Sequence, residues 1–154
     1  MDFKQMLITV LTGTIGTVGF SVLFKSDKRR TFCNALGGAL TCLVYVICCE
    51  IFDLEFFQNM FPALFATCYA EVMARVEKAP STPILACSII SLVPGSKLYY
   101  TTYYFVMGNM ELFDQTLMDT LKIAAGLAAG IICISVFVHE FNRHKFRNIF
   151  DLDD

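Results

Sequence analysis

The sequence has no tryptophan, only two histidines and few charged residues. Of its 154 residues, 17% are charged and 56% are hydrophobic, and the mean hydropathy is +0.59. Soluble domains usually contain about 25% charged and about 45–50% apolar residues, so the composition excludes an ordinary soluble domain. The net charge of −2 leaves no basic excess to neutralise phosphates, which argues against a nucleic-acid-binding protein. The composition is that of a membrane protein.

Groups that carry enzymatic chemistry are equally scarce. His139 and His144 stand at i and i+5, so they do not share one helical face as the zinc ligands of an HExxH motif do. The chain lacks a Ser/His/Asp set, a glycine-rich phosphate loop and a CxxC pair. We therefore expect neither an enzyme nor a bound metal or cofactor, and we interpret the seven cysteines as small buried hydrophobic residues.

What the chain does have is a series of apolar stretches of the length that crosses a bilayer. They predict an all-α polytopic membrane protein, one transmembrane domain with about five helices. The expected spans cover residues 5–24, 32–52, 60–76, 83–107 and 122–138. Residues 109–121 are amphipathic and are expected either to lie in the membrane interface or to continue into the next helix. Residues 139–154 form a polar tail.

The fourth apolar stretch is interrupted in its middle by Pro94 and Gly95. Proline lacks an N–H group and clashes with the preceding turn, so a helix is not expected to pass through unbroken. In lipid, the freed backbone groups need partners from protein, water or a ligand. A helix broken at mid-membrane is therefore a candidate substrate site.

Lys97 is the strongest charged candidate at this site. The amides near Gly95, Ser96 and Lys97 begin a new half-helix, whose N-terminus together with an ammonium group suits a carboxylate. The alternative is that Lys97 forms a structural ion pair, for which Glu71 is one partner to consider, or extends to the interface.

Hydroxyl groups follow the break. Tyr99, Tyr100 and Thr101 are candidates to hydrogen-bond a small polar solute, although anchoring at the membrane interface explains exposed tyrosines equally well.

Glu71 and Arg75 stand four residues apart in the third span, the spacing of an intrahelical ion pair. Two interpretations remain open for them. They form a structural pair, or Glu71 is a proton carrier whose protonation responds to substrate.

Most of the 12 Lys and Arg residues fall on one side of the expected spans, in residues 25–30, 75–78 and 143–147. By the positive-inside rule, five spans place the N-terminus outside and the C-terminus in the cytoplasm of a cell-membrane protein. An odd number of spans is also what one half of an inverted-repeat transporter has. We find no repeat within the chain, so a second half has to come from another chain.

Glycines recur at helical spacing in the first and fifth spans, for example Gly13, Gly16 and Gly19, and Gly126 with Gly130. Such residues let helices approach closely in lipid. Packing within this chain and a subunit interface, including a homo-oligomer, are both open.

Two motifs resemble the signature of the threonine/serine exporter family. They are Ala70-Glu71-x-x-Ala74-Arg75-x-x-Lys78-x-Pro80-x-Thr82 and Leu92-Val93-Pro94-Gly95-x-x-x-Tyr99. The resemblance is strong over residues 70–102 and is closest to the small subunit that corresponds to the C-terminal half of full-length exporters. Pro94, Gly95 and Tyr99 match the signature, whereas Lys97 lies at one of its variable positions.

This resemblance implies a subunit of a secondary exporter that acts with a larger membrane subunit. Its substrates would be small carboxylate-bearing solutes, either threonine- and serine-like amino acids or dicarboxylates such as succinate, and export would be coupled to protons. A non-transporting scaffold or assembly subunit is the alternative, favoured by the glycine-rich faces and by the lack of an obvious complete pathway in five spans.

Overall fold

Six α-helices and one short 3₁₀ helix make up nearly all of the described chain. The computed structural model describes the backbone of residues 3–150 and the side chains of residues 4–140. The elements are α1 (Phe3–Leu23), α2 (Lys28–Ile51), α3 (Glu55–Glu77), α4 (Ser81–Ile89), the 3₁₀ helix η1 (Ile90–Leu92), α5 (Gly95–Val106) and α6 (Met110–Phe150).

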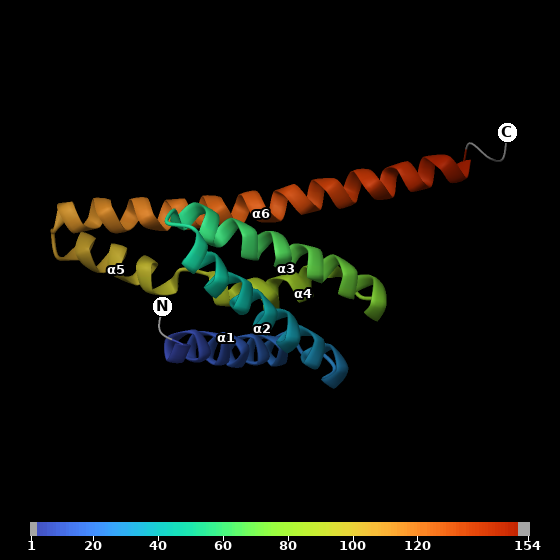
Figure 1. Cartoon of the computed structure of the whole chain (residues 1–154), viewed down its shortest axis with the longest axis horizontal. Helices are drawn as coiled ribbons and strands as arrows, with labels where there is room; N and C mark the ends of the chain where they lie inside the picture. Colours follow the sequence, from blue (N-terminus) through green and yellow to red (C-terminus); the bar gives the residue numbers. More distant parts are fainter. Residues whose placement is uncertain (1–2, 151–154) are drawn as a thin grey trace.

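The helices stack so that α1 and α6 form opposite sides of the molecule (Figure 1). Helix α1 packs on α2, α2 packs on α3 and α4, and α3 packs along α6. Helix α5 packs along the first part of α6, and this α5–α6 hairpin extends beyond the ends of α2 and α3 (Figure 1). The break before α5 therefore lies near the α2–α3 turn.

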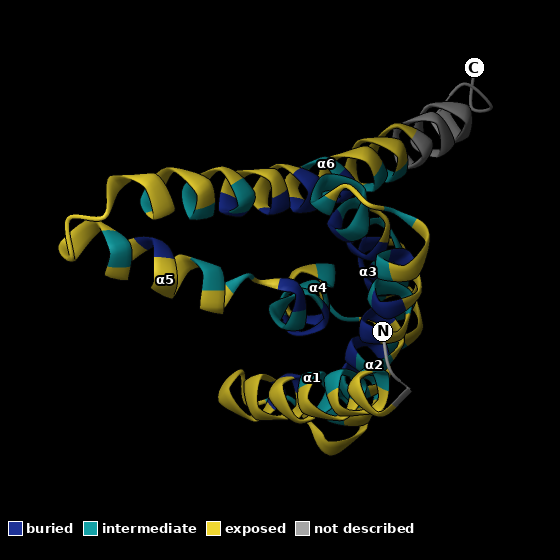
Figure 2. Cartoon of the chain, turned by 60° about the vertical axis from the view of Figure 1, so that its left-hand side comes forward, coloured by how far each residue is buried: buried dark blue, intermediate teal, exposed yellow. Residues whose placement is uncertain are grey.

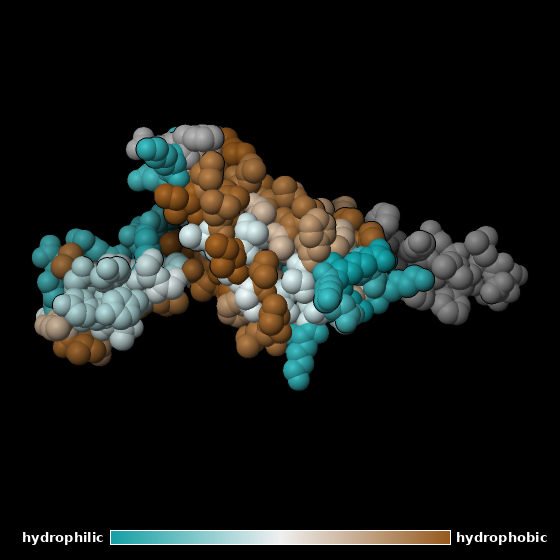
Figure 3. All heavy atoms as spheres, turned by 90° about the horizontal axis from the view of Figure 1, so that it is seen from below, coloured by the Kyte–Doolittle hydropathy of each residue, from teal (hydrophilic) through white to brown (hydrophobic). Residues whose placement is uncertain are grey.

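Small polar residues fill the helix contacts, and large apolar residues cover the outside. Thr17, Ser21, Thr41 and Ser88 are fully buried. The exposed residues of α1 include Leu7, Ile8, Leu11, Ile15, Val22 and Leu23. Figure 2 shows that most of α1 is exposed, and Figure 3 shows a continuous hydrophobic surface between more polar ends. Large apolar residues outside and small polar residues inside are typical of a protein surrounded by lipid.

Fewer spans are identified than the sequence predicts. Among the described residues, three helices are long and apolar enough to cross a membrane: Lys4–Leu23, Lys28–Ile51 and Met110–Glu140. Ser81–Leu92 and Gly95–Val106 meet the criteria together but are bent by 59°, which makes four spans if the pair counts as one. The expected span at residues 60–76 is not among them, and its helix α3 contains Gln58, Asn59, Glu71 and Arg75, which lower the mean hydropathy.

Several boundaries also differ from the expected ones. The expected spans at residues 32–52 and 60–76 leave residues 53–59 as a loop between them, but α3 begins at Glu55. Pro62 therefore lies inside the helix, whereas a helix that began at residue 60 would have it in the first turn. Residues 109–121 continue into the next apolar stretch, which is the second of the two expected arrangements. The helix extends into the polar tail as far as Phe150, and the rest of the tail lies outside the described residues. A helix of this length measures about 60 Å, twice the thickness of a bilayer core, so α6 extends beyond it.

Glycine sets the distance between α6 and α3. A Cβ atom at Gly130 would lie 2.8 Å from the Cβ of Ala63 and 2.9 Å from the backbone nitrogen of Leu64, and Gly126 meets the carbonyl oxygen of Phe56 in the same way. These two glycines therefore serve packing within the chain. On α1, by contrast, a Cβ atom at Gly16 or Gly19 would have no neighbouring atom within 4 Å.

We expect Gly130→Leu to destabilise the protein by about 1–3 kcal/mol, because the side chain has to push α6 away from the α3 backbone. Gly16→Leu is the matched control, since its side chain enters open space. Thermal unfolding in one detergent should give a lower midpoint for Gly130→Leu than for Gly16→Leu. Equal midpoints would contradict the close α3–α6 contact.

Candidate functional site

The helix is interrupted where the sequence places Pro94. Helix α4 ends at Ile89 and η1 ends at Leu92. Val93 is extended, and α5 begins at Gly95 with Pro94 as its N-cap residue. Proline has no N–H group and disfavours a helical conformation in the residue before it, which explains the extended Val93. The two helices meet at 59°. Whether this pair forms one broken span within a membrane stays a prediction.

The break leaves donors without acceptors at the start of α5. The Gly95 amide donates to the Val93 carbonyl at 2.8 Å, and the Leu98 amide donates to the Pro94 carbonyl at 3.0 Å. Within the described part of the chain, no acceptor is recorded for the Ser96 and Lys97 amides, and no side chain caps the helix. Two amides at the positive end of a helix dipole form a potential binding position for an anion.

A cavity of about 190 Å³ lies beside the break. Its walls come from α2, α3, the break itself, the first turn of α5, and α6. The lining residues are Tyr45, Asn59, Ser91, Leu92, Val93, Pro94, Ser96, Lys97 and Ile123. The cavity thus brings together three of the residues singled out in the sequence, Pro94, Ser96 and Lys97. Its volume is smaller than the pockets of about 300–1,000 Å³ that hold drug-sized ligands, and so suits a small solute.

Lys97 joins three helices at this cavity. Its ammonium group contacts Glu55 Oε1 on α3 and lies 3.4 Å from Asp119 Oδ2 on α6. Asp119 Oδ1 in turn lies 3.1 Å from the Lys122 ammonium group. We refer to Lys97, Glu55, Asp119 and Lys122 as the charge network. Glu71, the partner considered for Lys97 from the sequence, is not its partner in the structure.

Among the described atoms of the charge network, one carboxylate oxygen of Glu55 is buried without a hydrogen-bond partner. One carboxylate oxygen contacts Lys97, whereas the other, Oε2, is buried and has no hydrogen-bond partner among the described atoms. A buried oxygen without a partner costs free energy. Glu55 itself does not line the cavity and is connected to it through Lys97. Sequence reasoning missed Glu55 because it assigned this residue to a loop.

Asn59 and Tyr45 are further cavity residues that the sequence analysis did not select. Asn59 is 3% exposed, and its side-chain amide donates to the Glu55 carbonyl at 2.8 Å. The sequence signal that could have identified Asn59 is a polar amide directly beside an apolar stretch.

Gly95 does not line the cavity, and a Cβ atom at this position would meet no neighbouring atom within 4 Å. Tyr99 and Tyr100 are 66% and 50% exposed, do not line it either, and stack with Tyr103 and Tyr104 on the outer face of α5. A direct role for these tyrosines in binding stays a prediction.

Thr101 is buried on the opposite face of α5. Its hydroxyl donates to the Lys97 carbonyl at 2.8 Å and lies 3.4 Å from the Thr120 hydroxyl on α6. Thr101 therefore stabilises the first turn of α5 on the side that contacts α6. It does not line the cavity.

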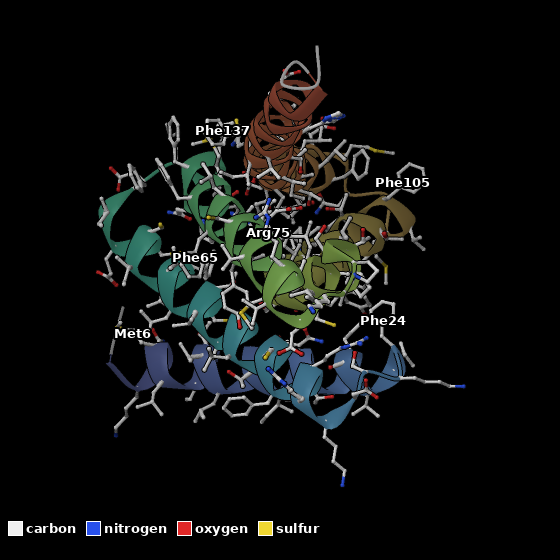
Figure 4. All side chains as sticks on the ribbon, turned by 90° about the vertical axis from the view of Figure 1, so that its right-hand side faces the viewer. Met6, Phe24, Phe65, Arg75, Phe105 and Phe137 are labelled. Atoms are coloured by element: carbon white, nitrogen blue, oxygen red, sulfur yellow. The ribbon has the colours of Figure 1, made fainter. Side chains whose placement is uncertain are left out.

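The Glu71–Arg75 pair lies away from the cavity. The two side chains are 3.6 Å apart, and the Arg75 guanidinium also donates to the Glu71 carbonyl at 3.1 Å. Glu71 stands about 18 Å further along α3 than Asn59, at a rise of about 1.5 Å per residue. Figure 4 shows Arg75 on the side of α3 that faces α6. This geometry is that of the structural ion pair, one of the two interpretations left open.

The described residues contain no group of three or more His, Cys, Asp or Glu side chains that could hold a metal ion. The potential ligand groups of the site are amides, one ammonium group, carboxylates and hydroxyls. They suit a small polar organic solute.

Comparison with known proteins assigns the chain to a family. Residues 9–137 match the family model described as "Threonine/Serine exporter, ThrE", which covers more than half of the sequence. No curated protein and no solved structure gives a significant match. The matched region includes the break, the cavity and the charge network. The chain therefore belongs to the threonine/serine exporter family, a family of membrane transporters rather than enzymes.

Proposed function

We propose that this chain is one subunit of a proton-coupled secondary exporter of small amino acids such as threonine and serine. The observation that carries the proposal is the cavity at the break, where amides of Ser96 and Lys97 without acceptors lie close to the charge network. The substrate carboxylate would bind the amides at the N-terminus of α5, with Lys97 adding a positive charge.

The negative part of the network favours an amino acid over a dicarboxylate such as succinate. An α-amino acid brings an ammonium group, which the Glu55 carboxylate beside Lys97 would attract. A dicarboxylate would instead place a second negative charge near Glu55 and Asp119, which lie on both sides of Lys97. Two like charges in a poorly solvated site repel each other strongly.

Proton coupling would involve Glu55 rather than Glu71. Glu55 is ion-paired with Lys97, which lines the cavity, so a proton and the ammonium group of a substrate would compete for the same carboxylate. A carboxylate holds a proton less readily when a cation lies beside it. Substrate binding and protonation would thus be linked through one side chain.

The chain would act with a larger subunit of the same family in the cell membrane, with its N-terminus outside and its C-terminus in the cytoplasm. The cavity lies near one end of the α2–α3 pair, and the α5–α6 hairpin beyond it is largely exposed (Figure 2). A second subunit facing this hairpin would complete a pathway around the cavity, in the manner of two halves of an inverted repeat.

A non-transporting assembly subunit is the second candidate. It is favoured by the exposed face of α1 around Gly16 and Gly19, which has no neighbouring atoms and suits close contact with another helix. In that case, changes at the cavity would alter assembly without altering which solute moves.

The first test removes one amide from the proposed carboxylate position. Ser96→Pro deletes the N–H group at a place where the first turn of a helix tolerates proline, whereas Ser96→Ala removes only the hydroxyl. Proteoliposomes with both subunits and a pH gradient should transport labelled threonine with Ser96→Ala at close to the original rate. With Ser96→Pro the rate should fall at least tenfold. Equal rates for the two variants at equal incorporation would contradict the site.

The second test concerns substrate choice. Glu55→Gln should lower the rate for threonine and serine at least tenfold and reduce their preference over succinate, because the variant no longer attracts an ammonium group. Glu111→Gln, which changes an exposed carboxylate in the first turn of α6, is the matched control. If Glu55→Gln reduces complex assembly but leaves the solute preference and the pH dependence unchanged, the assembly subunit becomes the better explanation.

A further inference from the structure

A second cavity, far from the break, lies where α1 ends and α4 begins. Its volume is about 100 Å³. Phe24, labelled in Figure 4, stands at its edge. The residues that matter for its chemistry are Lys25, Arg30, Asn34 and the first residues around α4.

The cavity is lined by positive charge with little compensation. Lys25 and Arg30 both line it. The only acidic partner recorded for Arg30 among the described residues is Asp27, at 3.8 Å, with side chains 43% and 78% exposed. An exposed pair at this distance contributes little. Arg29 and Glu77 neutralise each other in a separate 3.0 Å pair nearby.

The N-terminus of α4 lies at the cavity, which Pro80, Pro83 and Ile84 line. Helix α4 begins after Pro80, which makes no side-chain cap. No described hydrogen bond uses the Ser81 or Thr82 amide as a donor. These amides and the helix dipole favour a negatively charged group in front of α4.

Asn34 has an unpartnered polar atom at the cavity. It lines the cavity from α2, is 1% exposed, and donates from Nδ2 to Ser21 Oγ at 2.9 Å. Its Oδ1 atom is buried and has no partner among the described atoms. If the carboxamide is rotated by half a turn, Oδ1 accepts from the Ser21 hydroxyl and the NH₂ group becomes available as a donor. An anion in the cavity would favour that orientation.

We propose that this cavity binds a single phosphate group, held by Lys25, Arg30, the Asn34 amide and the N-terminus of α4. The small volume fits one tetrahedral anion. Two sources share this chemistry, the headgroup of an anionic phospholipid and free inorganic phosphate. The lipid is favoured by the apolar residues beside the cavity, because Val22, Leu23 and Phe24 at the end of α1 are exposed and can contact acyl chains.

The test compares two double variants that remove the same charge. Lys25→Asn with Arg30→Gln changes the cavity, and asparagine tolerates the positive φ of 51° at position 25. Lys28→Gln with Lys78→Asn removes two cations at the same end of the protein but outside the cavity lining. Native mass spectrometry of the full chain in detergent would measure binding of phosphatidylglycerol, with diacylglycerol as the phosphate-free control, and of inorganic phosphate alone.

We expect one phosphatidylglycerol per chain, with affinity reduced at least tenfold in the cavity variant and less than twofold in the control variant. The same pattern with inorganic phosphate alone also supports the site and identifies the free anion as its ligand. Equal weakening by both variants would mean that only the general positive charge matters and would overturn the proposal. Failure of both phosphate probes to bind would overturn it as well.

Discussion

The arrangement around the cavity depends on the ion pairs that the ammonium group of Lys97 forms with two carboxylates. Lys97 follows the break directly and contacts Glu55 on α3 and Asp119 on α6. Without this contact, α5 is held mainly by its packing along α6. Two carboxylates pair with Lys97, whose side chain is 32% exposed, and thereby connect the first turn of α5 to α3 and α6. The same carboxylates make the site sensitive to charge that enters the cavity.

Helix packing explains why a cavity exists at this place. Elsewhere the helices touch through glycine, serine and threonine, as at Gly130 against α3. Helix α4 packs against α2 and α3, whereas α5 packs along α6, and the cavity lies where the chain passes from one to the other around Pro94. The polar residues that line this gap, among them Asn59 and Ser91, are the ones that a solute replacing water would contact.

The interruption of the helices around Pro94 can be traced to local features of the sequence, whereas a broken membrane span at this place stays a prediction. Pro94 acts on its immediate neighbours, so its effect can be read without knowing the rest of the fold. The family resemblance, carried by residues 70–102, was confirmed by the match over residues 9–137. The all-helical class was confirmed for the described residues, whereas the number of spans was not.

The partners of Lys97 could not be predicted, because they depend on tertiary contacts. Glu55 was assigned to a loop, since its neighbours are acidic and aromatic, yet α3 begins there. Asp119 was placed on an amphipathic segment of uncertain position, and only the unbroken course of α6 brings it to Lys97. Glu71 was the partner considered for Lys97 from the sequence, but in the structure it pairs with Arg75, four residues away. Hydrophobicity alone does not show which face of a helix meets which neighbour.

A direct test of the central claim is to locate the carboxylate of bound substrate. Solid-state NMR on the reconstituted two-subunit complex can measure the dipolar coupling between threonine labelled with ¹³C at its carboxyl group and ¹⁵N in the Ser96 and Lys97 amides. The account predicts a coupling typical of a hydrogen bond, with N···O about 2.9 Å, that disappears when unlabelled threonine displaces the ligand. Bound, displaceable threonine without coupling to either amide would contradict it.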